Sequence, residues 1–272
     1  MITVTDWPKL FKEATTEILR ETQPLFGSFK AKEELGMGAG GDITRFIDAL
    51  AESIVIRKLQ NNDISCILVS EEKGTQEILG GGTDYVILDG IDGTTNTLHR
   101  IPFSATSIAH SSGPSLSKVD YGLVVDLNSG TQFSAMKNRG AYENSKRVSP
   151  STITHLEEAV VSIELSYRKD FNWLAKRLMP VMAHASKLRQ LGSTALESAY
   201  VASGILDAFV DLRGLSRAVD LAAAALIVHE AGAYIVGPDG KDLDMELGAD
   251  VRTSFLATGN RILLEEILDM IG

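Results

Sequence analysis

Two aspartates lie close together in the stretch YVILDGIDGTTN, residues 85–96. An apolar run ends at Asp89, and Asp92 follows after only Gly90 and Ile91. Two carboxylates at the end of a buried strand repel each other and lose solvation, so their proximity needs a reason. Asp-Gly also favours a turn, and it occurs twice here. A plain turn is therefore the simplest alternative while this stretch is considered alone.

Three more acidic residues stand at the ends of apolar runs or at the start of one. Glu71 and Glu72 follow ILVS directly, just as Asp89 and Asp92 follow YVIL. If the two strands are neighbours, their charges meet at one edge of a sheet and need a cation. Oxygen-only ligands suit Mg²⁺ or Mn²⁺ better than zinc or copper. Asp220 opens an apolar helix, where it could equally stabilise the helix dipole. Together these acids favour a metal site.

Other catalytic patterns find little support. The loop of residues 36–42 contains GxGxxG, but no apolar strand precedes it, so a mobile glycine loop near an active site is a better interpretation than a dinucleotide site. The sequence has no GxxxxGK[ST], HExxH or GxSxG motif, and its five histidines are scattered. Cys66 is the only cysteine, which excludes an internal disulfide and a cysteine-built zinc site.

The pattern of apolar residues predicts an α+β first half and a layered α/β second half. We expect helices from Asp6 to about Phe26 and over 43–60, the second with Asp42 as its cap. The predicted strands of this half are 64–70, 84–89, 105–111, 119–127 and 131–137. Beyond them strands are predicted at 157–165, 205–212, 233–237 and 254–259, and helices at 170–185, 193–203 and 219–231. A polar stretch around Pro150 predicts a domain boundary, giving domains 1–149 and 150–272.

Composition is that of an ordinary globular protein, with 44% hydrophobic and 23% charged residues among 272. The net charge of −10 disfavours binding to nucleic acid and to anionic membranes, because both bind through excess lysine and arginine. No apolar run is long enough to span a bilayer, and the N-terminus lacks the layout of a signal peptide. Cys66 cannot form an internal disulfide, and this lone cysteine leads us to expect a cytoplasmic protein.

Several segments resemble the signature of the inositol monophosphatase-like, Mg²⁺-dependent sugar phosphatases. These are Glu71 in SEEKG, LDGIDGTTN followed by IPF at 101–103, and VDLAAA followed by EAGA. GDITRFIDALAE and NRGAYENSKRVSPS also look like family segments, so the resemblance covers nearly the whole chain. The stretch LRQLGSTALESAYVASGILDAFVDLRG is most similar to the archaeal inositol monophosphatase and fructose-1,6-bisphosphatase branch. The resemblance implies the sugar-phosphatase fold, an αβαβα layered sandwich.

The resemblance also implies roles for the acidic residues. One ion would be held by Glu71, Asp89 and the carbonyl of Ile91, and a second by Asp89, Asp92 and Asp220. The cofactor would be two or three Mg²⁺ ions, with Mn²⁺ possible, and the third would lie near the glycine loop and Asp48. Two ions can clamp the attacking and leaving oxygens of an in-line phosphoryl displacement. Lithium sensitivity and a homodimer are further family expectations.

The same resemblance assigns the water and the substrate. Glu71 and the Thr94 hydroxyl would orient and deprotonate the attacking water, Asp92 is a further catalytic residue, and the leaving alkoxide would take a proton from water near Asp220. Backbone N–H groups of Gly93 and Thr94 would bind the phosphate if a helix starts there. The remaining expected substrate contacts are Gly192, Ser193, Arg189 and Arg213.

The sequence departs from the family pattern at three positions. Gly90 stands where relatives usually have proline, and Val219 replaces the tryptophan that commonly precedes the last aspartate. Gly40 stands where archaeal relatives often have an aspartate, which leaves the third metal open, and Asp42 is a possible substitute.

Substrate choice rests on one position. A glutamate seven residues before the last metal aspartate grips sugar hydroxyls in the animal enzymes, and here that position is Arg213. A guanidinium favours an anionic group, so we hypothesise that a second phosphate, as in fructose 1,6-bisphosphate, is bound there. Neighbouring residues that could add to this pocket are Arg189, Arg217, Arg168 and Tyr167, and the alternative is that these are ordinary surface residues.

The sequence therefore predicts an enzyme that hydrolyses small sugar or polyol phosphate monoesters. Inositol 1-phosphate and fructose 1,6-bisphosphate are the expected substrates. The alternatives are a phosphatase acting on 3′-phosphoadenosine 5′-phosphate or NADP, and a catalytically silent homologue that only binds metal. Because Glu71 and Thr94 are both present, the silent homologue is the weaker alternative.

Overall fold

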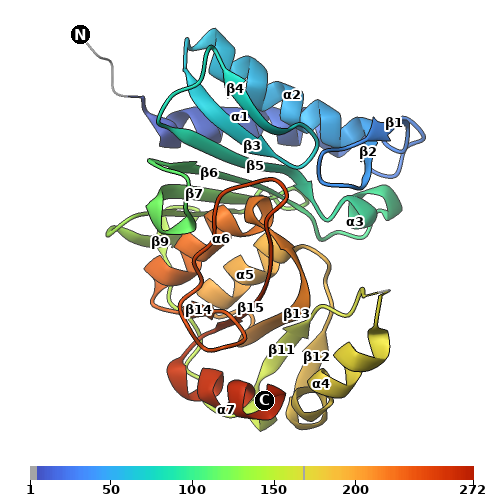
Figure 1. Cartoon of the computed structure of the whole chain (residues 1–272), viewed down its shortest axis with the longest axis vertical. Helices are drawn as coiled ribbons and strands as arrows, with labels where there is room; N and C mark the ends of the chain where they lie inside the picture. Colours follow the sequence, from blue (N-terminus) through green and yellow to red (C-terminus); the bar gives the residue numbers. More distant parts are fainter. Residues whose placement is uncertain (1–4, 168) are drawn as a thin grey trace.

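The computed structural model describes residues 5–167 and 169–272 and arranges them in alternating layers of helix and sheet (Figure 1). An eight-stranded sheet has the order β10-β9-β8-β7-β6-β5-β3-β4. Its strands are β3 (Cys66–Ser70), β4 (Gly74–Ile78), β5 (Tyr85–Asp92), β6 (Ala105–Ser111), β7 (Val119–Asp126), β8 (Gln132–Met136), β9 (Gly140–Glu143) and β10 (Lys146–Arg147). A five-stranded sheet has the order β12-β11-β13-β15-β14. Its strands are β11 (Val160–Ile163), β12 (Lys187–Arg189), β13 (Ala208–Arg217), β14 (Tyr234–Val236) and β15 (Arg252–Thr258).

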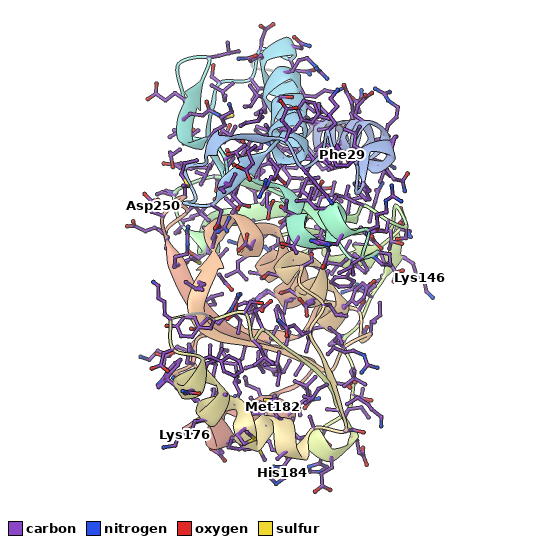
Figure 2. All side chains as sticks on the ribbon, turned by 90° about the vertical axis from the view of Figure 1, so that its right-hand side faces the viewer. Phe29, Lys146, Lys176, Met182, His184 and Asp250 are labelled. Carbon is purple, nitrogen blue, oxygen red and sulfur yellow. The ribbon has the colours of Figure 1, made fainter. Side chains whose placement is uncertain are left out.

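Helices cover both faces of each sheet. The outer face of the large sheet carries α1 (Trp7–Thr22) and α2 (Phe46–Asn61), and the outer face of the small sheet carries α4 (Phe171–His184) and α7 (Arg261–Ile271). Between the sheets lie α5 (Thr194–Ala202) and α6 (Ala218–Ala231), and α3 (Thr94–His99) follows β5. Side chains fill the spaces between these layers (Figure 2). The predicted αβαβα sandwich is confirmed.

Local sequence explains the two kinds of helix. In α1 the buried residues Leu10, Phe11, Ala14 and Ile18 recur at helical spacing, and the Asp6 carboxylate accepts a hydrogen bond from the N–H of residue 9 at 3.0 Å. In α6 ten of the fourteen residues are buried, because this helix lies between two sheets. The outer helix α1 is therefore amphipathic, whereas the central helix α6 is apolar on most of its surface.

Two close approaches depend on glycine. A Cβ on Gly122 of β7 would lie 2.9 Å from the backbone of Ala223, so α6 can pack this near the large sheet only with glycine there. A Cβ on Gly90 of β5 would lie 2.9 Å from the Ala51 methyl group of α2. The departure from the usual family proline at this position therefore accompanies a tight contact between β5 and α2.

The predicted start of the second helix is wrong. Residues Ile43–Arg45 form β2, which pairs antiparallel with β1 (Glu34–Met37), and α2 begins only at Phe46 with Arg45 as its N-cap. Asp42 lies in the connecting loop, where its carbonyl accepts a hydrogen bond from the N–H of Gly38 at 2.9 Å. Ile43 fits the helical spacing of 43–60 because it is apolar, but it is 42% exposed on β2, so the spacing alone did not reveal the short hairpin strand.

The strands divide near the predicted boundary. The last strand of the eight-stranded sheet ends at Arg147, and the first strand of the five-stranded sheet begins at Val160. However, α5 and α6 from the second part pack against strands of the first part in one shared core. The division into domains 1–149 and 150–272 stays a prediction.

Candidate metal centre

Three carboxylates converge where β3 ends beside the last part of β5. β3 and β5 are parallel neighbours with Ser70 opposite Leu88, so the next residues, Glu71 and Asp89, lie side by side at one sheet edge. Asp220 comes from the first turn of α6. Carboxylate oxygens of Glu71, Asp89 and Asp220 all lie within 4.8 Å of one another. The structure thus brings together three acids that are far apart in the sequence.

Burial and mutual repulsion make this cluster unfavourable without a cation. Desolvation raises the pKa of Asp89 well above its usual value, and the charges of Asp92, Asp220 and Asp48 raise it further. Desolvation also raises the pKa of Asp220, although Arg217 opposes the shift. The three acids offer only oxygen ligands, and these are the donors that hard divalent cations require. The residues present therefore fit a divalent metal ion.

Asp92 lies beside this group but is held by the start of α5. Its carboxylate accepts hydrogen bonds from the Ser193 hydroxyl at 2.6 Å and from the N–H groups of Thr194 at 3.2 Å and Ala195 at 2.7 Å. Desolvation, followed by the charge of Asp220, raises the pKa of Asp92 to about 7. Asp92 therefore links the cluster to the helix layer between the sheets.

The Thr94 hydroxyl contacts Asp48 directly. Its Oγ1 lies 2.9 Å from the Asp48 carboxylate and 3.0 Å from the carbonyl of Ile91, which are the two acceptors for its single hydrogen. Desolvation raises the pKa of Asp48 to about 7. The family resemblance relates Asp48 only to a third metal, whereas the structure gives Asp48 a partner in Thr94, the residue expected to activate the water.

A further buried acid lies one turn along α2. Glu52 accepts hydrogen bonds from the Ser70 hydroxyl at 3.0 Å and from the N–H of Glu72 at 2.9 Å, and burial raises its pKa to about 7. Sequence reasoning missed this residue. The available signal was the spacing of Asp48 and Glu52, which places two acids four residues apart on the buried face of one helix.

The glycine loop covers the edge of the cluster. The N–H of Gly40 donates to the Glu71 carbonyl at 2.8 Å, and the Arg252 guanidinium donates to the Gly40 carbonyl at 3.0 Å. Arg217 forms an ion pair with Glu71 and another with Asp42 at 2.8 Å. Asp42 thus contacts an arginine that also pairs with an acid of the cluster, and the loop is bonded to residues from both halves of the chain.

Comparisons with known proteins agree with this geometry. A model of the inositol monophosphatase family matches residues 9–269. The chain belongs to the inositol monophosphatase family. It is similar to a fructose-1,6-bisphosphatase/inositol-1-monophosphatase of Methanothermobacter thermautotrophicus, with 35% identity over 97% of this chain and 96% of that protein. It is also similar to the crystal structure of an inositol monophosphatase–fructose 1,6-bisphosphatase, with a TM-score of 0.87, 29% identity, and coverage of 98% and 100% of the two chains.

The chain is also similar to a bifunctional NADP phosphatase/NAD kinase of Methanocaldococcus jannaschii. It is 30% identical over 97% of this chain, but the match covers only 50% of that longer protein. The relatives therefore include phosphatases named for different substrates.

The predicted phosphate cradle, formed by the N–H groups of Gly93 and Thr94, begins at a residue with a left-handed backbone conformation. Gly93 has φ +94°, and α3 starts with Thr94 directly after it. The first N–H groups of a helix have no partner within the helix, so they can face an anion. A Cβ on Gly93 would lie 3.2 Å from the carbonyl of Gly192, which places the two predicted substrate-binding turns against each other.

The predicted substrate residues Gly192 and Ser193 use their N–H groups elsewhere. Both N–H groups donate to the buried carboxylate of Glu197, at 3.1 and 3.2 Å, and the Ser193 hydroxyl donates to Asp92. Sequence reasoning missed Glu197, which follows Ser193 by only four residues on α5. Residue spacing alone does not reveal that its side chain turns back toward the loop.

Arg213 is paired with acids of its own sheet. A bulge between Asp211 and Ser216 interrupts the pairing of β13 with β15, and Arg213 lies within it. Its guanidinium donates to the Asp211 carboxylate at 2.6 and 2.9 Å and lies 3.7 Å from Glu164. Arg189 is exposed at the end of β12. Arg168, also named in the sequence analysis, lies outside the described residues.

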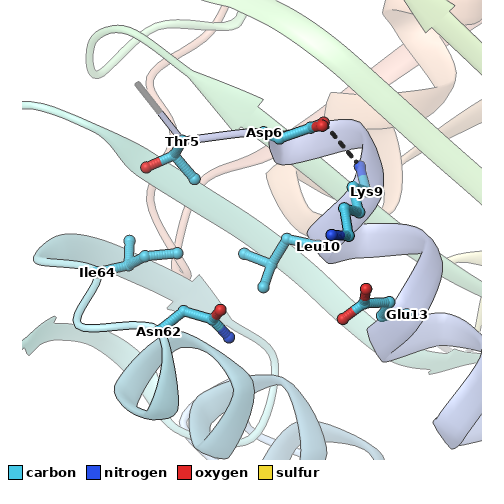
Figure 3. A pocket seen from close by; sticks show the side chains of 7 residues that line it. All are labelled: Thr5, Asp6, Lys9, Leu10, Glu13, Asn62 and Ile64. Atoms are coloured by element: carbon cyan, nitrogen blue, oxygen red, sulfur yellow. Dashed lines mark hydrogen bonds between the residues drawn. The ribbon is translucent and has the colours of Figure 1, made fainter. Parts of the chain in front are cut away.

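A separate pocket of about 250 Å³ lies at the start of α1 (Figure 3). Its polar character comes mainly from the charged side chains of Asp6, Lys9 and Glu13. The Asp6 carboxylate already caps α1 through the N–H of Lys9. None of the clustered acids lines this pocket. The remaining lining residues are Thr5, Leu10, Asn62 and Ile64.

Proposed function

We propose that this protein hydrolyses small sugar or polyol phosphate monoesters in a Mg²⁺-dependent reaction. The observation that carries the proposal is the convergence of Glu71, Asp89 and Asp220 from three separate elements within 4.8 Å. Asp89 is buried and the other two acids are half-buried, so their mutual repulsion costs free energy that the ion pair of Arg217 with Glu71 offsets only in part and a bound cation would relieve. The direct test is phosphate release from inositol 1-phosphate with Mg²⁺ and with EDTA, and we expect activity only with the metal.

We propose Glu71, Asp89 and the Ile91 carbonyl as ligands of one ion, and Asp89, Asp92 and Asp220 as ligands of a second. Asp48 stands beside them as a candidate for a third, and Mn²⁺ is a possible substitute. When bound, such ions lower the pKa of a coordinated water and neutralise the charge of the phosphate.

The chain's own residues supply the proton transfer. We propose that the Thr94 hydroxyl accepts a proton from the attacking water while its own hydrogen passes toward Asp48, 2.9 Å away. Glu71 orients the same water. The water oxygen forms a bond to phosphorus, the ester P–O bond breaks, and the departing alkoxide takes a proton from solvent. N–H groups at Gly93 and Thr94 hold the phosphate oxygens during this displacement.

Replacing Thr94 by valine tests this proton path. Thr94→Val keeps the shape of the side chain but removes the hydroxyl between the water and Asp48, so kcat should fall by about 100-fold. Thr94→Ser restores a hydroxyl and should retain most of the activity. Steady-state phosphate release at saturating Mg²⁺ measures both variants. A Thr94→Val enzyme within twofold of the wild type would contradict the proposed role.

Arg189 is our candidate for selecting a second phosphate. The relatives are named for both fructose 1,6-bisphosphate and inositol 1-phosphate. Arg213, our initial candidate, has its guanidinium bound by Asp211 and Glu164, whereas Arg189 is exposed at the end of β12. Breaking the pair between Arg213 and Asp211 would leave a buried carboxylate without its partner. We therefore expect the second phosphate of the substrate to bind Arg189 in preference to Arg213.

The two arginines can be separated by their effects on two substrates. Arg189→Ala should lower kcat/KM for fructose 1,6-bisphosphate about tenfold more than for inositol 1-phosphate, because only the bisphosphate has a second anionic group. Arg213→Ala is the matched control, and it should reduce both values together by uncovering Asp211. If Arg213→Ala lowered kcat/KM for fructose 1,6-bisphosphate alone and Arg189→Ala lowered it equally for both substrates, Arg213 would be the residue that binds the second phosphate.

A second candidate function is removal of a nucleotide phosphate, as from NADP or 3′-phosphoadenosine 5′-phosphate. Two observations favour it: the NADP phosphatase relative, and an aromatic pair of Tyr167 and the exposed Trp173, whose ring centroids are 6.4 Å apart. An aromatic ring of this kind can stack on a base. Measuring kcat/KM for NADP, 3′-phosphoadenosine 5′-phosphate and the two sugar phosphates would rank the candidates. Hydrolysis of none of them, with metal bound, would indicate the silent homologue.

Four expectations stay predictions for this chain. Lithium sensitivity and a homodimer are implied by the family, whereas a cytoplasmic location and the absence of nucleic-acid partners were expected from the composition and charge of the sequence. Among the described residues, none of the helices combines the length and the apolar character that crossing a bilayer requires.

A further inference from the structure

Glu197 is a buried carboxylate that binds one short loop. It lies in the first turn of α5 with 1% of its surface exposed. The N–H groups of Leu191, Gly192 and Ser193 donate to it at 3.3, 3.1 and 3.2 Å, and the Ser162 hydroxyl of β11 donates from the other side. A buried carboxylate persists only where such donors replace water.

The next two N–H groups of the chain turn to a different carboxylate. Thr194 and Ala195 donate to Asp92 at 3.2 and 2.7 Å, and the Ser193 hydroxyl joins them at 2.6 Å. The consecutive N–H groups of residues 191–195 are thus divided between Glu197 and Asp92. Because one rigid loop serves both acids, a shift at Glu197 must change the donors that orient Asp92.

The opposite edge of this loop is fixed against the phosphate cradle. The Asn96 amide donates to the carbonyl of Leu191 at 2.6 Å and to that of Phe103 at 2.8 Å. Gly192 has φ +84°, and a Cβ there would lie 3.3 Å from the Asn96 amide nitrogen. Glycine and Asn96 therefore hold the loop against α3, and Glu197 holds it against α5.

We propose that Glu197 is a positioning residue for Asp92, acting through the loop of residues 191–195. The proposal rests on the proposed function, in which Asp92 is a ligand of a divalent cation. The loop donors fix which lone pairs of Asp92 remain for a metal, and Glu197 fixes the loop. Glu197 itself does not touch the cluster of Glu71, Asp89 and Asp220.

Glu197→Gln is the first test. Glutamine has nearly the same shape, but its NH₂ group would face N–H donors of the loop, so the loop must shift. We expect the Kd for Mn²⁺, measured by calorimetry without substrate, to rise about tenfold, and kcat to fall by a similar factor. Glu197→Asp keeps the buried charge but withdraws it by one methylene group, and we expect a smaller change in the same direction.

Ser162→Ala is the matched control. It removes a hydroxyl that binds Glu197 from β11 and leaves every donor of the loop in place. We expect a lower Tm but a Kd for Mn²⁺ within twofold of the wild type. If Ser162→Ala weakened Mn²⁺ binding as much as Glu197→Gln, general loosening of the core would explain both, and the positioning role would be wrong.

A double-mutant cycle separates action through the loop from an independent effect. Ser193→Ala removes the hydroxyl that binds Asp92 directly. If Glu197 acts through the same loop, the double variant of Ser193→Ala and Glu197→Gln should weaken Mn²⁺ binding by clearly less than the product of the single effects. Independent, multiplicative effects would overturn the proposed route.

The outcomes distinguish this inference from the proposed function. Wild-type protein that binds Mn²⁺ but hydrolyses no phosphate ester would overturn the function, while the Mn²⁺ Kd values of the variants would still decide the role of Glu197. Glu197→Gln and Glu197→Asp with wild-type circular dichroism and unchanged Kd would overturn the positioning role alone. Wild-type protein that binds no Mn²⁺ would overturn both.

Discussion

Asp89→Asn should reduce kcat by about 1,000-fold and should raise the Tm of the metal-free protein. The loss of activity follows because Asp89 is the one proposed ligand shared by both ions, and a loss of this size corresponds to about 4 kcal/mol of transition-state stabilisation. The gain in stability follows because Asp89 is buried among like charges of Asp92, Asp220 and Asp48, which repel it.

The local geometry makes asparagine a clean replacement at this position. The N–H of Ile91 donates to the Asp89 carboxylate at 3.0 Å, and an asparagine carbonyl can accept the same hydrogen bond. Its NH₂ group would face neighbouring carboxylate oxygens of Glu71 and Asp220, which are acceptors. Asp92→Asn is a poorer test, because Asp92 accepts two backbone N–H groups and a hydroxyl at the start of α5.

Phosphate-release kinetics at saturating Mg²⁺ and thermal unfolding in EDTA measure the two effects of Asp89→Asn. We expect the metal-free Tm to rise by about 3 °C, the size that relief of about 1 kcal/mol of repulsion gives in a chain of this length. Asp239→Asn is the control, since Asp239 is exposed and pairs with Lys241 away from the cluster. Activity of Asp89→Asn above one tenth of the wild-type value would show that Asp89 is not a shared ligand.

The acids of the cluster could be predicted because each stands at the end or at the start of an apolar run. An apolar strand locates Glu71 and another locates Asp89, and parallel neighbouring strands end at the same sheet edge. Asp220 could be placed at a helix start from the apolar run that follows it. Apolar patterns could not show how the two halves of the chain pack against each other. That packing brings Asp220 next to Glu71 and Asp89.

The contacts between side chains could not be predicted in the same way. Asp48 and Thr94 are 46 residues apart, and only the packing of α2 on β5 brings them to 2.9 Å. Arg213 was chosen because it stands seven residues before Asp220 in the sequence. That count does not show that Arg213 lies in a bulge of β13, where its guanidinium donates to Asp211. Counting along a strand is reliable only while the strand keeps its register.

The metal-free protein should be more stable at pH 6 than at pH 8, and Mg²⁺ should stabilise it most at pH 8. Burial raises the pKa of Asp48, Glu52, Asp92 and Glu197 to about 7, whereas unfolded carboxyl groups titrate near 4. Between these values the folded state holds more protons than the unfolded state, so its stability falls as the pH rises through about 7. Mg²⁺ can replace the lost protons within the cluster but cannot bind while they remain.

Thermal unfolding at the two pH values, with EDTA and with 10-fold Mg²⁺ excess over its Kd, measures this linkage. We expect the metal-free Tm to be about 5 °C higher at pH 6 than at pH 8, and the Mg²⁺-induced rise in Tm to be clearly larger at pH 8. Asp89→Asn is the matched variant, because it removes one titrating group at the centre of the repulsion and should flatten both dependences. Equal Mg²⁺ shifts at both pH values would mean that the cation binds away from the buried acids, and the proton-linked metal centre would then be wrong even if the protein hydrolyses phosphate esters.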